Sequence, residues 1–238
     1  MSVEYAVAPA PQPSVAVAGG STLFPVRRIY CVGRNYAEHA REMGGNPERE
    51  PPFFFMKPAD AVLSSSNNGL GGPHIEMAYP PMTDNLQHEV ELVVAIGRTG
   101  VNIAPEVACD HIFGYAVGLD MTRRDVQSGL REAGRPWEMA KAFDQSAPIG
   151  AIHAAAQVGH PTRGVIWLGV NGVERQRSDI ARMTWSVAEV VAKLSQYVRL
   201  GPGDLIFTGT PQGVSRVVRG DVLNCGIAGL GELFLTIV

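Results

Sequence analysis

Two glutamates, Glu89 and Glu91, are separated by one residue in an apolar run that is rich in β-branched side chains. Side chains on a strand alternate between its faces, so both carboxylates are predicted to point the same way. Two carboxylates side by side in an apolar segment repel each other and are costly to desolvate unless a cation lies between them. Asp120, which ends a second apolar run, is a candidate third ligand. Three carboxylates suit a hard divalent cation such as Mg²⁺ or Mn²⁺.

The same Glu-x-Glu spacing also fits the solvated face of a half-exposed antiparallel strand, which is a common arrangement. The following residues, 92–96, continue the run as Leu-Val-Val-Ala-Ile without polar alternation. A strand of this composition is predicted to be covered on both faces. The two glutamates are therefore predicted to lie in a buried site.

A second candidate group is the pair His39 and Glu42, three residues apart in the segment 31–43. On a helix this spacing places both side chains on one face. A carboxylate beside an imidazole fixes the tautomer of the ring and raises its basicity, which suits a general base that acts on water. The alternative is a surface ion pair on a polar helix, which is common and contributes little to stability. Two glycines open the segment 44–51, which is predicted to be mobile, as a closing lid requires.

The elements that must position these residues are mostly short, because 27 glycines and 17 prolines interrupt the chain. The period of the apolar residues predicts three helices, at 35–43, 122–133 and 186–197. The last of them begins with Ser186 and Glu189, which have the spacing of a capping box. Runs between turn residues predict eight strands, at 29–32, 53–57, 89–96, 112–119, 164–170, 204–208, 221–225 and 232–238.

The dipeptide Asn171-Gly172 separates the runs 165–170 and 173–176, and it is a strong signal for a two-residue hairpin turn. Unequal strands with few helices favour a mixed, β-rich α+β fold over a doubly wound βαβ sheet.

We expect one domain, at 25–238, because the chain has 238 residues and no repeat or internal linker. Residues 1–24 are rich in proline and alanine and are expected to form a flexible tail, with a short early strand as the alternative. The first twenty residues lack lysine and arginine, so they do not resemble a secretory signal. No run of about 18 apolar residues occurs, and no membrane span is expected. The expected lid occupies about 34–51.

The composition limits the kinds of ligand that the protein is expected to bind. The net charge of −3 argues against a nucleic-acid-binding protein, which needs a basic surface. With 18% charged and 45% hydrophobic residues, the chain is expected to fold compactly and to bind a small molecule. Cys31, Cys109 and Cys225 are odd in number and lack metal-site spacing, which is typical of a reduced cytoplasm.

Six motifs in this order resemble the fumarylacetoacetate hydrolase family: GRNY at 33–36, FMKP at 55–58, HEVEL at 88–92, GLDMTRRD at 118–125, KAF at 141–143 and TGTP at 208–211. The resemblance covers about 29–238. It implies the family fold, a mixed β-sandwich roll with few short helices. Within the family, the segment 37–61, with Gly-Gly-Asn-Pro and three consecutive phenylalanines, most resembles the branch that cleaves fumarylpyruvate.

The resemblance also implies roles for single residues. It implies metal ligands for Mg²⁺ or Mn²⁺ at Glu89, Glu91 and Asp120, in agreement with the strand period. It implies a catalytic pair, His39 and Glu42, on a lid that orders when substrate binds. Substrate contacts are implied at Arg124, Gln127, Lys141 and Thr210, and Lys141 is also counted with the catalytic group. Arg124 and Gln127 have the spacing of one helix face.

Some residues are left without a role. Lys57 either lines the site or is structural, so it is kept out of the catalytic set. Ser215 replaces a glycine that often occurs in the family, and it is expected to alter only a loop. Five histidines have no partner that the sequence identifies: His74, His88, His111, His153 and His160.

The activity that the resemblance implies is hydrolysis of the carbon–carbon bond of an acylpyruvate, a β-diketone acid. Fumarylpyruvate, an intermediate of the gentisate route of aromatic degradation, is the expected substrate. The alternatives on the same site are oxaloacetate decarboxylation and diene-dioate isomerisation. A homodimer is expected, since exposed apolar β-structure is usually covered.

Overall fold

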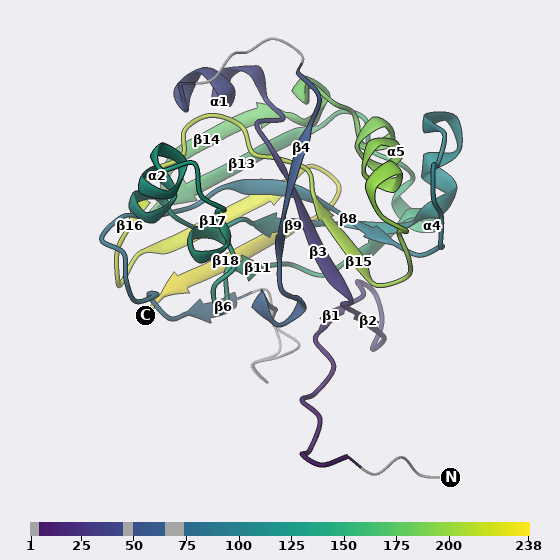
Figure 1. Cartoon of the computed structure of the whole chain (residues 1–238), viewed down its shortest axis with the longest axis horizontal. Coiled ribbons are helices and arrows are strands. Elements are labelled where there is room, and N and C mark those ends of the chain that lie inside the picture. Colours follow the sequence, from purple (N-terminus) through teal and green to yellow (C-terminus); the bar gives the residue numbers. More distant parts are fainter. Residues whose placement is uncertain (1–4, 45–49, 65–73) are drawn as a thin grey trace.

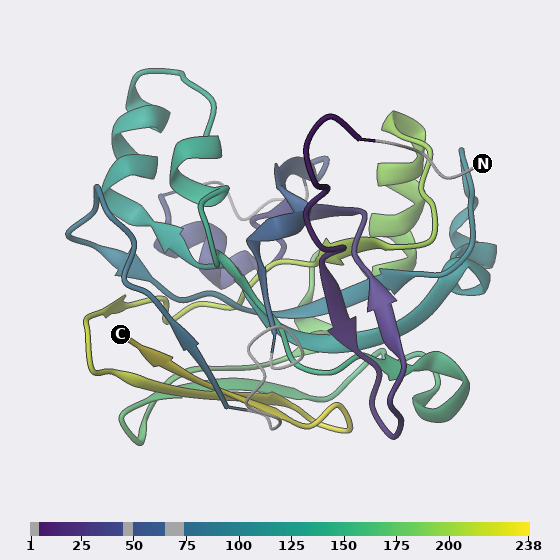
Figure 2. The ribbon, with the colours of Figure 1, turned by 90° about the horizontal axis from the view of Figure 1, so that it is seen from below.

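The computed structural model describes residues 5–44, 50–64 and 74–238 (Figure 1). The core of the fold is two sheets, which Figure 2 shows as stacked layers. The six-stranded sheet has the spatial order β12 (His153–Ala154), β9 (Ile112–Leu119), β8 (Val90–Ile96), β15 (Asp204–Phe207), β3 (Arg28–Gly33) and β4 (Phe53–Lys57). The five-stranded sheet has the order β14 (Val173–Asp179), β13 (Val165–Val170), β17 (Val222–Ile227), β18 (Glu232–Ile237) and β6 (His74–Met77).

Both large sheets are mixed. Neighbouring strands are antiparallel except for β15 with β3 and β18 with β6, which are parallel. Short strands form three smaller sheets: β1 (Ser14–Ala16) with β2 (Leu23–Pro25); β10 (Thr122–Arg123), β7 (Leu86–Gln87) and β16 (Arg216–Val217); and β11 (Ala147–Pro148) with β5 (Val62–Leu63). This strand-rich α+β architecture confirms the predicted fold class.

The helices are short and lie outside the two sheets. They are α1 (Ala37–Glu42), α2 (Arg124–Glu132), α3 (Glu138–Lys141), α4 (Ala155–Val158) and α5 (Val187–Tyr197), with 3-10 turns at Ala59–Ala61, Pro105–His111 and Ile180–Arg182. Figure 2 shows α2 and α3 on the side of the six-stranded sheet that faces away from the five-stranded sheet. Among the described residues, no helix is both long enough and apolar enough to cross a membrane.

Successive side chains of strand β8 point alternately into two apolar clusters, one on each face of the sheet. Its even-numbered residues, from Val90 to Ile96, belong to the core between the two sheets. Val93 and Ala95 point to the outer face, where they join a cluster that includes residues of the β1–β2 hairpin. The strand is therefore buried on both faces, as its composition predicts. Glu91 shares the outer face with Val93 and Ala95, so its carboxylate is directed away from the main core.

The longer elements lie where the sequence predicts them. All eight predicted strands and all three predicted helices are present, with boundaries within two residues of those expected. Asn171 and Gly172 both have positive φ, 51° and 78°, as a two-residue hairpin turn of type I′ requires. The capping box of Ser186 and Glu189 is formed at the start of α5.

The N-terminal segment differs from the prediction. The β1–β2 hairpin occupies part of the expected tail at 1–24, and its Val15 and Phe24 are buried. Each side chain covers the outer face of the six-stranded sheet, and this burial stabilises the hairpin. The expectation of a flexible tail is therefore wrong for the second half of that range. Strands this short give no periodic signal, so the sequence allows an early strand but does not place it.

Candidate active site

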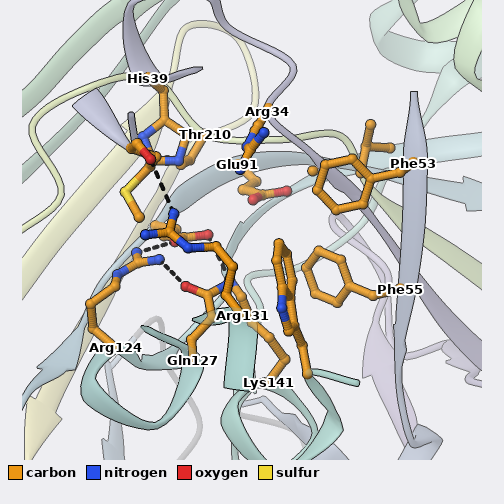
Figure 3. A pocket seen from close by; sticks show the side chains of 15 residues that line it. Arg34, His39, Phe53, Phe55, Glu91, Arg124, Gln127, Arg131, Lys141 and Thr210 are labelled. Carbon is orange, nitrogen blue, oxygen red and sulfur yellow. Dashed lines mark hydrogen bonds and ion pairs between the residues drawn. The ribbon is translucent and has the colours of Figure 1, made fainter. Parts of the chain in front are cut away.

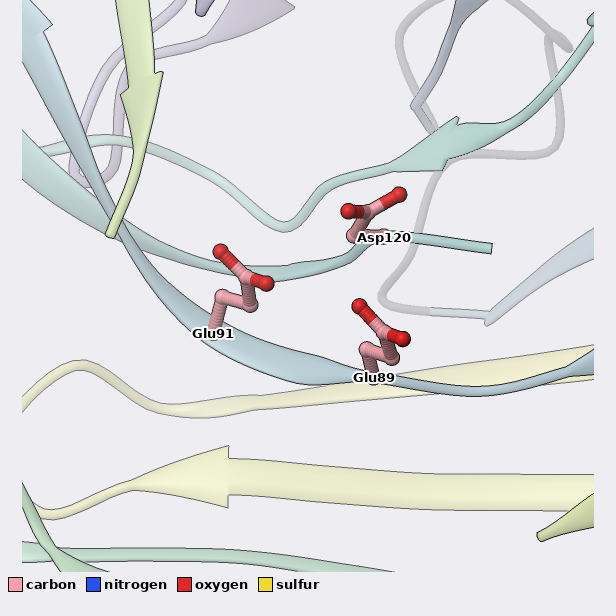
Figure 4. Close-up of side chains that lie close together, drawn as sticks. All are labelled: Glu89, Glu91 and Asp120. Atoms are coloured by element: carbon pink, nitrogen blue, oxygen red, sulfur yellow. The ribbon is translucent and has the colours of Figure 1, made fainter. Parts of the chain in front are cut away.

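The side chains of Glu89, Glu91 and Asp120 come together at the ends of β8 and β9 (Figure 4). All three are buried, and each offers a carboxylate oxygen within 4.8 Å of the others. The Asp120 N–H donates to Glu89 O at 2.9 Å, and Glu91 lies opposite Gly118. A Cβ at Gly118 would lie 2.6 Å from Val93 Cγ2, so glycine leaves room for the Val93 side chain beside the site.

Two of the three carboxylates are paired with buried cations. Arg124 Nη2 donates to Glu89 Oε1, and Lys141 Nζ lies 2.8 Å from both Glu89 Oε2 and Asp120 Oδ2. Lys57 Nζ lies 2.8 Å from Asp120 Oδ1, as an ion pair without hydrogen-bond geometry. Burial opposes ionisation of Glu89, but the charges of Lys141 and Arg124 outweigh it and hold the pKa of Glu89 well below its usual range.

Glu91 is different, because it has no ion-pair partner in the described part of the chain. Its carboxylate accepts a hydrogen bond from the Gly209 N–H at 2.6 Å. Burial, followed by the negative charges of Asp120 and Glu89, raises the pKa of Glu91 well above its usual value. A proton or an added cation must therefore compensate this carboxylate. The three residues fit a hard divalent ion such as Mg²⁺ or Mn²⁺.

Binding of Mn²⁺ is expected to release a proton from Glu91 at any pH below the raised pKa of this carboxyl group. Below its raised pKa the metal-free carboxyl holds a proton, which binding must displace. The apparent affinity for Mn²⁺ should therefore rise with pH until Glu91 is ionised in the metal-free protein as well. Calorimetric titration in buffers with different ionisation enthalpies counts the released protons. Equal heats in all buffers across the acidic range down to about pH 5 would contradict the raised pKa of Glu91.

His39 and Glu42 form the predicted pair on α1. His39 Nδ1 lies 2.9 Å from Glu42 Oε2, and Glu42 Oε1 accepts a hydrogen bond from the Gly213 N–H at 3.0 Å. Because a carboxylate only accepts, Nδ1 carries the proton of the neutral ring and Nε2 is left as an acceptor. Burial opposes ionisation of Glu42, but the hydrogen bonds from His39 and Gly213 lower its pKa. His39 is only 5% exposed, so this is not a surface ion pair.

Arg124 and Gln127 lie on one face of α2, as their spacing predicts, and both are buried. Arg124 Nη1 donates to Gln127 Oε1 at 2.5 Å, and Nε donates to Gln87 Oε1 at 2.8 Å. Since Nη2 binds Glu89, one guanidinium joins α2, β7 and the carboxylate cluster. Its fixed position beside the carboxylates suits it to meet an anionic ligand bound there.

Lys141 is enclosed by acceptors. Its ammonium donates to Glu89, to Asp120 and, at 2.6 Å, to Thr122 Oγ1. Burial lowers the pKa of Lys141, but the charges of Asp120 and Glu89 outweigh this effect and raise it. The side chain is therefore a cation at neutral pH, and any contact with a substrate requires one of its three donors to change partner.

A pocket that encloses about 450 Å³, part of it open to solvent, lies over the carboxylates (Figure 3). Seven of the nine predicted site residues line this pocket, namely His39, Glu89, Glu91, Arg124, Gln127, Lys141 and Thr210. Glu42 and Asp120 do not. Phe53 and Phe55 of β4, with Trp137, form an apolar wall. Of the expected lid at 34–51, residues 45–49 lie outside the described residues.

Two residues near the site have structural roles that the sequence does not reveal. Lys57 is fully buried and faces Asp120, so the Met-Lys-Pro motif supplies a counter-charge. Asn35 of the GRNY motif donates from Nδ2 to Thr208 O at 2.8 Å and to Trp185 O at 2.9 Å. It thereby holds the loop whose Gly209 N–H contacts Glu91. The positions of Lys57 and Asn35 within the motifs are the only sequence signal for these roles. The residues that they contact are distant in sequence, so the contacts themselves could not be predicted.

A series of buried, hydrogen-bonded side chains beneath the site joins the two sheets. The Val90 N–H donates to Gln176 Oε1 at 3.2 Å, and Gln176 Nε2 donates to Pro211 O at 2.8 Å. These two backbone groups fix the orientation of the amide, so His88 Nδ1 must donate to Oε1, at 2.8 Å. His88 Nε2 then accepts from the Ser215 hydroxyl, also at 2.8 Å. Burial lowers the pKa of His88 to about 4, so the ring is neutral at pH 7.

The same series of buried hydrogen bonds also fixes the side chain of Thr210, which lines the pocket. Gln176 Nε2 donates to Thr210 Oγ1 at 2.9 Å, and that hydroxyl donates to Val90 O at 2.8 Å. Ser215, expected to affect only a loop, contacts His88 and so supports the residue next to Glu89. Sequence reasoning missed this arrangement because Gln176 reaches β8 from the other sheet.

Replacing Gln176 with leucine is expected to lower the free energy of unfolding by about 2–5 kcal/mol, because buried donors and acceptors on β8 and the 210–211 loop would lose their partners. Urea denaturation measures the change. Gln196→Leu is the matched control, since Gln196 is exposed on α5 and bonds only to Lys193. Equal stability of the two variants would show that this series of buried hydrogen bonds contributes little.

Residues 28–238 match the family model described as fumarylacetoacetate (FAA) hydrolase C-terminal. The chain therefore belongs to the fumarylacetoacetate hydrolase family, as its motifs indicate. Fumarylpyruvate hydrolase from Pseudomonas aeruginosa, crystallised in complex with Mn²⁺ and pyruvate, is 54% identical; the structures have a TM-score of 0.93 over 99% of both chains.

Two curated relatives belong to the same family but carry different names. Fumarylpyruvate hydrolase of a Ralstonia species is 40% identical over 79% of this chain and 93% of its own. The mitochondrial oxaloacetate tautomerase FAHD1 of Arabidopsis thaliana is 39% identical over 87% of this chain and 88% of its own. Family membership alone therefore leaves the reaction to be argued from the site.

Proposed function

We propose that this protein is a metal-dependent hydrolase that cleaves fumarylpyruvate to fumarate and pyruvate. The observation that carries the proposal is the position of His39, which is held by Glu42 and lines the same pocket as Glu89 and Glu91. A base beside a cation site provides the two requirements of carbon–carbon hydrolysis, activated water and stabilisation of a carbanionic leaving group. The likeness to the Pseudomonas aeruginosa enzyme supports the choice of substrate.

Glu89, Glu91 and Asp120 would hold Mg²⁺ or Mn²⁺, which their oxygen-only donor set and the lack of an ion-pair partner for Glu91 among the described residues support. When bound, the ion supplies positive charge close to the ketone and carboxylate oxygens of the pyruvate part of the substrate. Mn²⁺ in the Pseudomonas aeruginosa structure supports this assignment.

The residues of the chain carry out the proton transfers. In the proposed mechanism, Arg124 and Gln127 bind the pyruvate part, and Lys141 adds positive charge beside it. His39 Nε2 removes a proton from water, and the resulting hydroxide attacks the carbonyl carbon of the acyl group. The bond from that carbon to the neighbouring methylene then breaks, and its electron pair forms the enolate of pyruvate. Protonation of the methylene carbon completes pyruvate, and the acyl group leaves as a carboxylate.

The alternative is chemistry on oxaloacetate, which the oxaloacetate tautomerase among the relatives brings into consideration. Tautomerisation and decarboxylation both pass through an enolate but consume no water. The His39–Glu42 pair, which suits activation of water, favours hydrolysis.

Ultraviolet assays distinguish these reactions when fumarylpyruvate and oxaloacetate are offered to the same Mn²⁺-loaded protein. We expect kcat/KM for fumarylpyruvate to exceed that for oxaloacetate by at least about 100-fold, on the scale of specificity that polar sites achieve. Consumption of oxaloacetate alone would overturn the proposal. Mg²⁺ and Mn²⁺ are compared in parallel.

We also propose a cytoplasmic homodimer that acts in the gentisate route. The three cysteines are free thiols, which supports a reduced compartment. Exposed apolar side chains such as Leu23, Met56 and Met139 support an interface that a second copy covers. Sedimentation velocity measures the oligomeric state.

A further inference from the structure

Arg34 and Arg131 enter the active-site pocket from two different elements (Figure 3). Arg34 follows β3 and is half-buried, and its guanidinium carbon lies 5.9 Å from the centre of the Phe53 ring. Arg131 lies in the last turn of α2, and its Nη1 donates to Met43 O at 3.1 Å. Within the described residues, neither guanidinium is paired with a carboxylate.

The charges in the pocket explain why these two arginines matter. Arg124 and Lys141 are already paired with Glu89, and the carboxylates that line the pocket are only Glu89 and Glu91. A ligand with a single carboxylate, bound over the metal-site carboxylates, would leave at least one of Arg34 and Arg131 without a negative partner. The pocket as a whole therefore favours a ligand with two anionic groups.

The backbone at Arg34 adds an independent observation. Its φ is +57°, in the left-handed region that arginine seldom adopts. Gly33 precedes it, where a Cβ would come within 1.9 Å of the Phe53 ring. The close contact with Phe53 and the turn at Arg34 direct the arginine side chain into the pocket. Strain of this kind at a pocket-lining residue is typical of a functional position.

One wall of the pocket suits a flat, unsaturated chain. Phe53 and Phe55 pack edge-on against Trp137, with ring centres 5.5 Å and 6.1 Å apart. All three aromatic rings line the pocket together with Arg34. A conjugated acyl chain can lie against these rings and carry its terminal charge to the guanidinium groups.

We propose that Arg34 and Arg131 bind a second carboxylate, at the far end of the acyl group, and so select dicarboxylic acylpyruvates over those with an uncharged acyl group. The inference rests on the proposed acylpyruvate hydrolysis. It assigns the selectivity to residues separate from those at the pyruvate end. Because Arg131 also holds Met43, the residue after α1, a carboxylate bound there lies next to the helix that carries His39.

The test compares fumarylpyruvate with acetylpyruvate, which has the same dioxo acid but no second carboxylate. For Arg34→Met and Arg131→Met, we expect the ratio of the two kcat/KM values to fall by about 10- to 100-fold, the value of a charge-assisted pair. Methionine keeps the apolar stem of arginine. Arg135→Met is the control, because Arg135 is exposed beyond α2 and does not line the pocket. An unchanged ratio in both test variants would overturn the inference.

A binding measurement on the wild-type protein tests recognition of the second carboxylate without any substitution. Calorimetry on the Mn²⁺-loaded protein compares fumarate with crotonate, which has the same four-carbon skeleton and one carboxylate. Fumarate should bind at least about 10-fold more tightly. Equal affinities would contradict the assignment of the far end, whereas a wild-type protein that cleaves neither acylpyruvate would contradict the proposed function itself.

Discussion

Replacement of His39 by alanine is expected to lower kcat for fumarylpyruvate by about 10²- to 10⁴-fold, the usual contribution of a general base. The change removes Nε2, the acceptor that faces the pocket, and leaves the carboxylate cluster intact. Affinity for Mn²⁺ should therefore remain, and KM should change little. The loss of ultraviolet absorbance of the substrate measures turnover, and calorimetry measures the metal.

Two further variants test whether the loss of turnover is due to the His39–Glu42 pair. Glu42→Gln keeps an acceptor for His39 Nδ1 but removes the negative charge, so kcat should fall less than in His39→Ala. His111→Ala serves as the control, because the His111 ring does not line the pocket and hydrogen-bonds to Arg98 O. Near-normal turnover in His39→Ala would show that another group activates water.

The regular parts of the fold could be predicted because their signals are local. The uninterrupted apolar run of β8 predicts a strand buried on both faces, and the strand period then places Glu89 and Glu91 on one side. The i,i+3 spacing likewise predicts the contact of His39 with Glu42. Each inference uses residues within one element, where distance along the chain fixes distance in space.

The missed features depend on contacts between distant elements. Lys57 meets Asp120 across 63 positions of sequence, and Gln176 meets His88 across 88. No period relates such residues, because the packing of the sheets decides which side chains meet. The same limit applies to Arg34 and Arg131, whose common pocket is evident only once β3 and α2 are placed.

Replacement of Glu91 by glutamine is expected to abolish Mn²⁺ binding and turnover together, and to stabilise the metal-free protein. Glu91 is buried, has no cationic partner among the described residues, and is repelled by Asp120 and Glu89. Glutamine keeps the acceptor for the Gly209 N–H but removes the charge that must otherwise be neutralised by a proton. Stability and function should therefore change in opposite directions, as is common where a site stores unfavourable electrostatics.

Thermal unfolding with and without Mn²⁺ separates the two effects. At a concentration of about 100 Kd, the metal should stabilise the wild type by about 2.7 kcal/mol. This corresponds to a rise in Tm of about 5–10 °C for a domain of this size. In Glu91→Gln this rise should be absent, while Tm without metal should exceed that of the wild type. Glu174→Gln is the control, because Glu174 is half-exposed and pairs only with Arg177. A lower metal-free Tm in Glu91→Gln would mean that the carboxylate is compensated without a cation, and the metal site would then need other ligands.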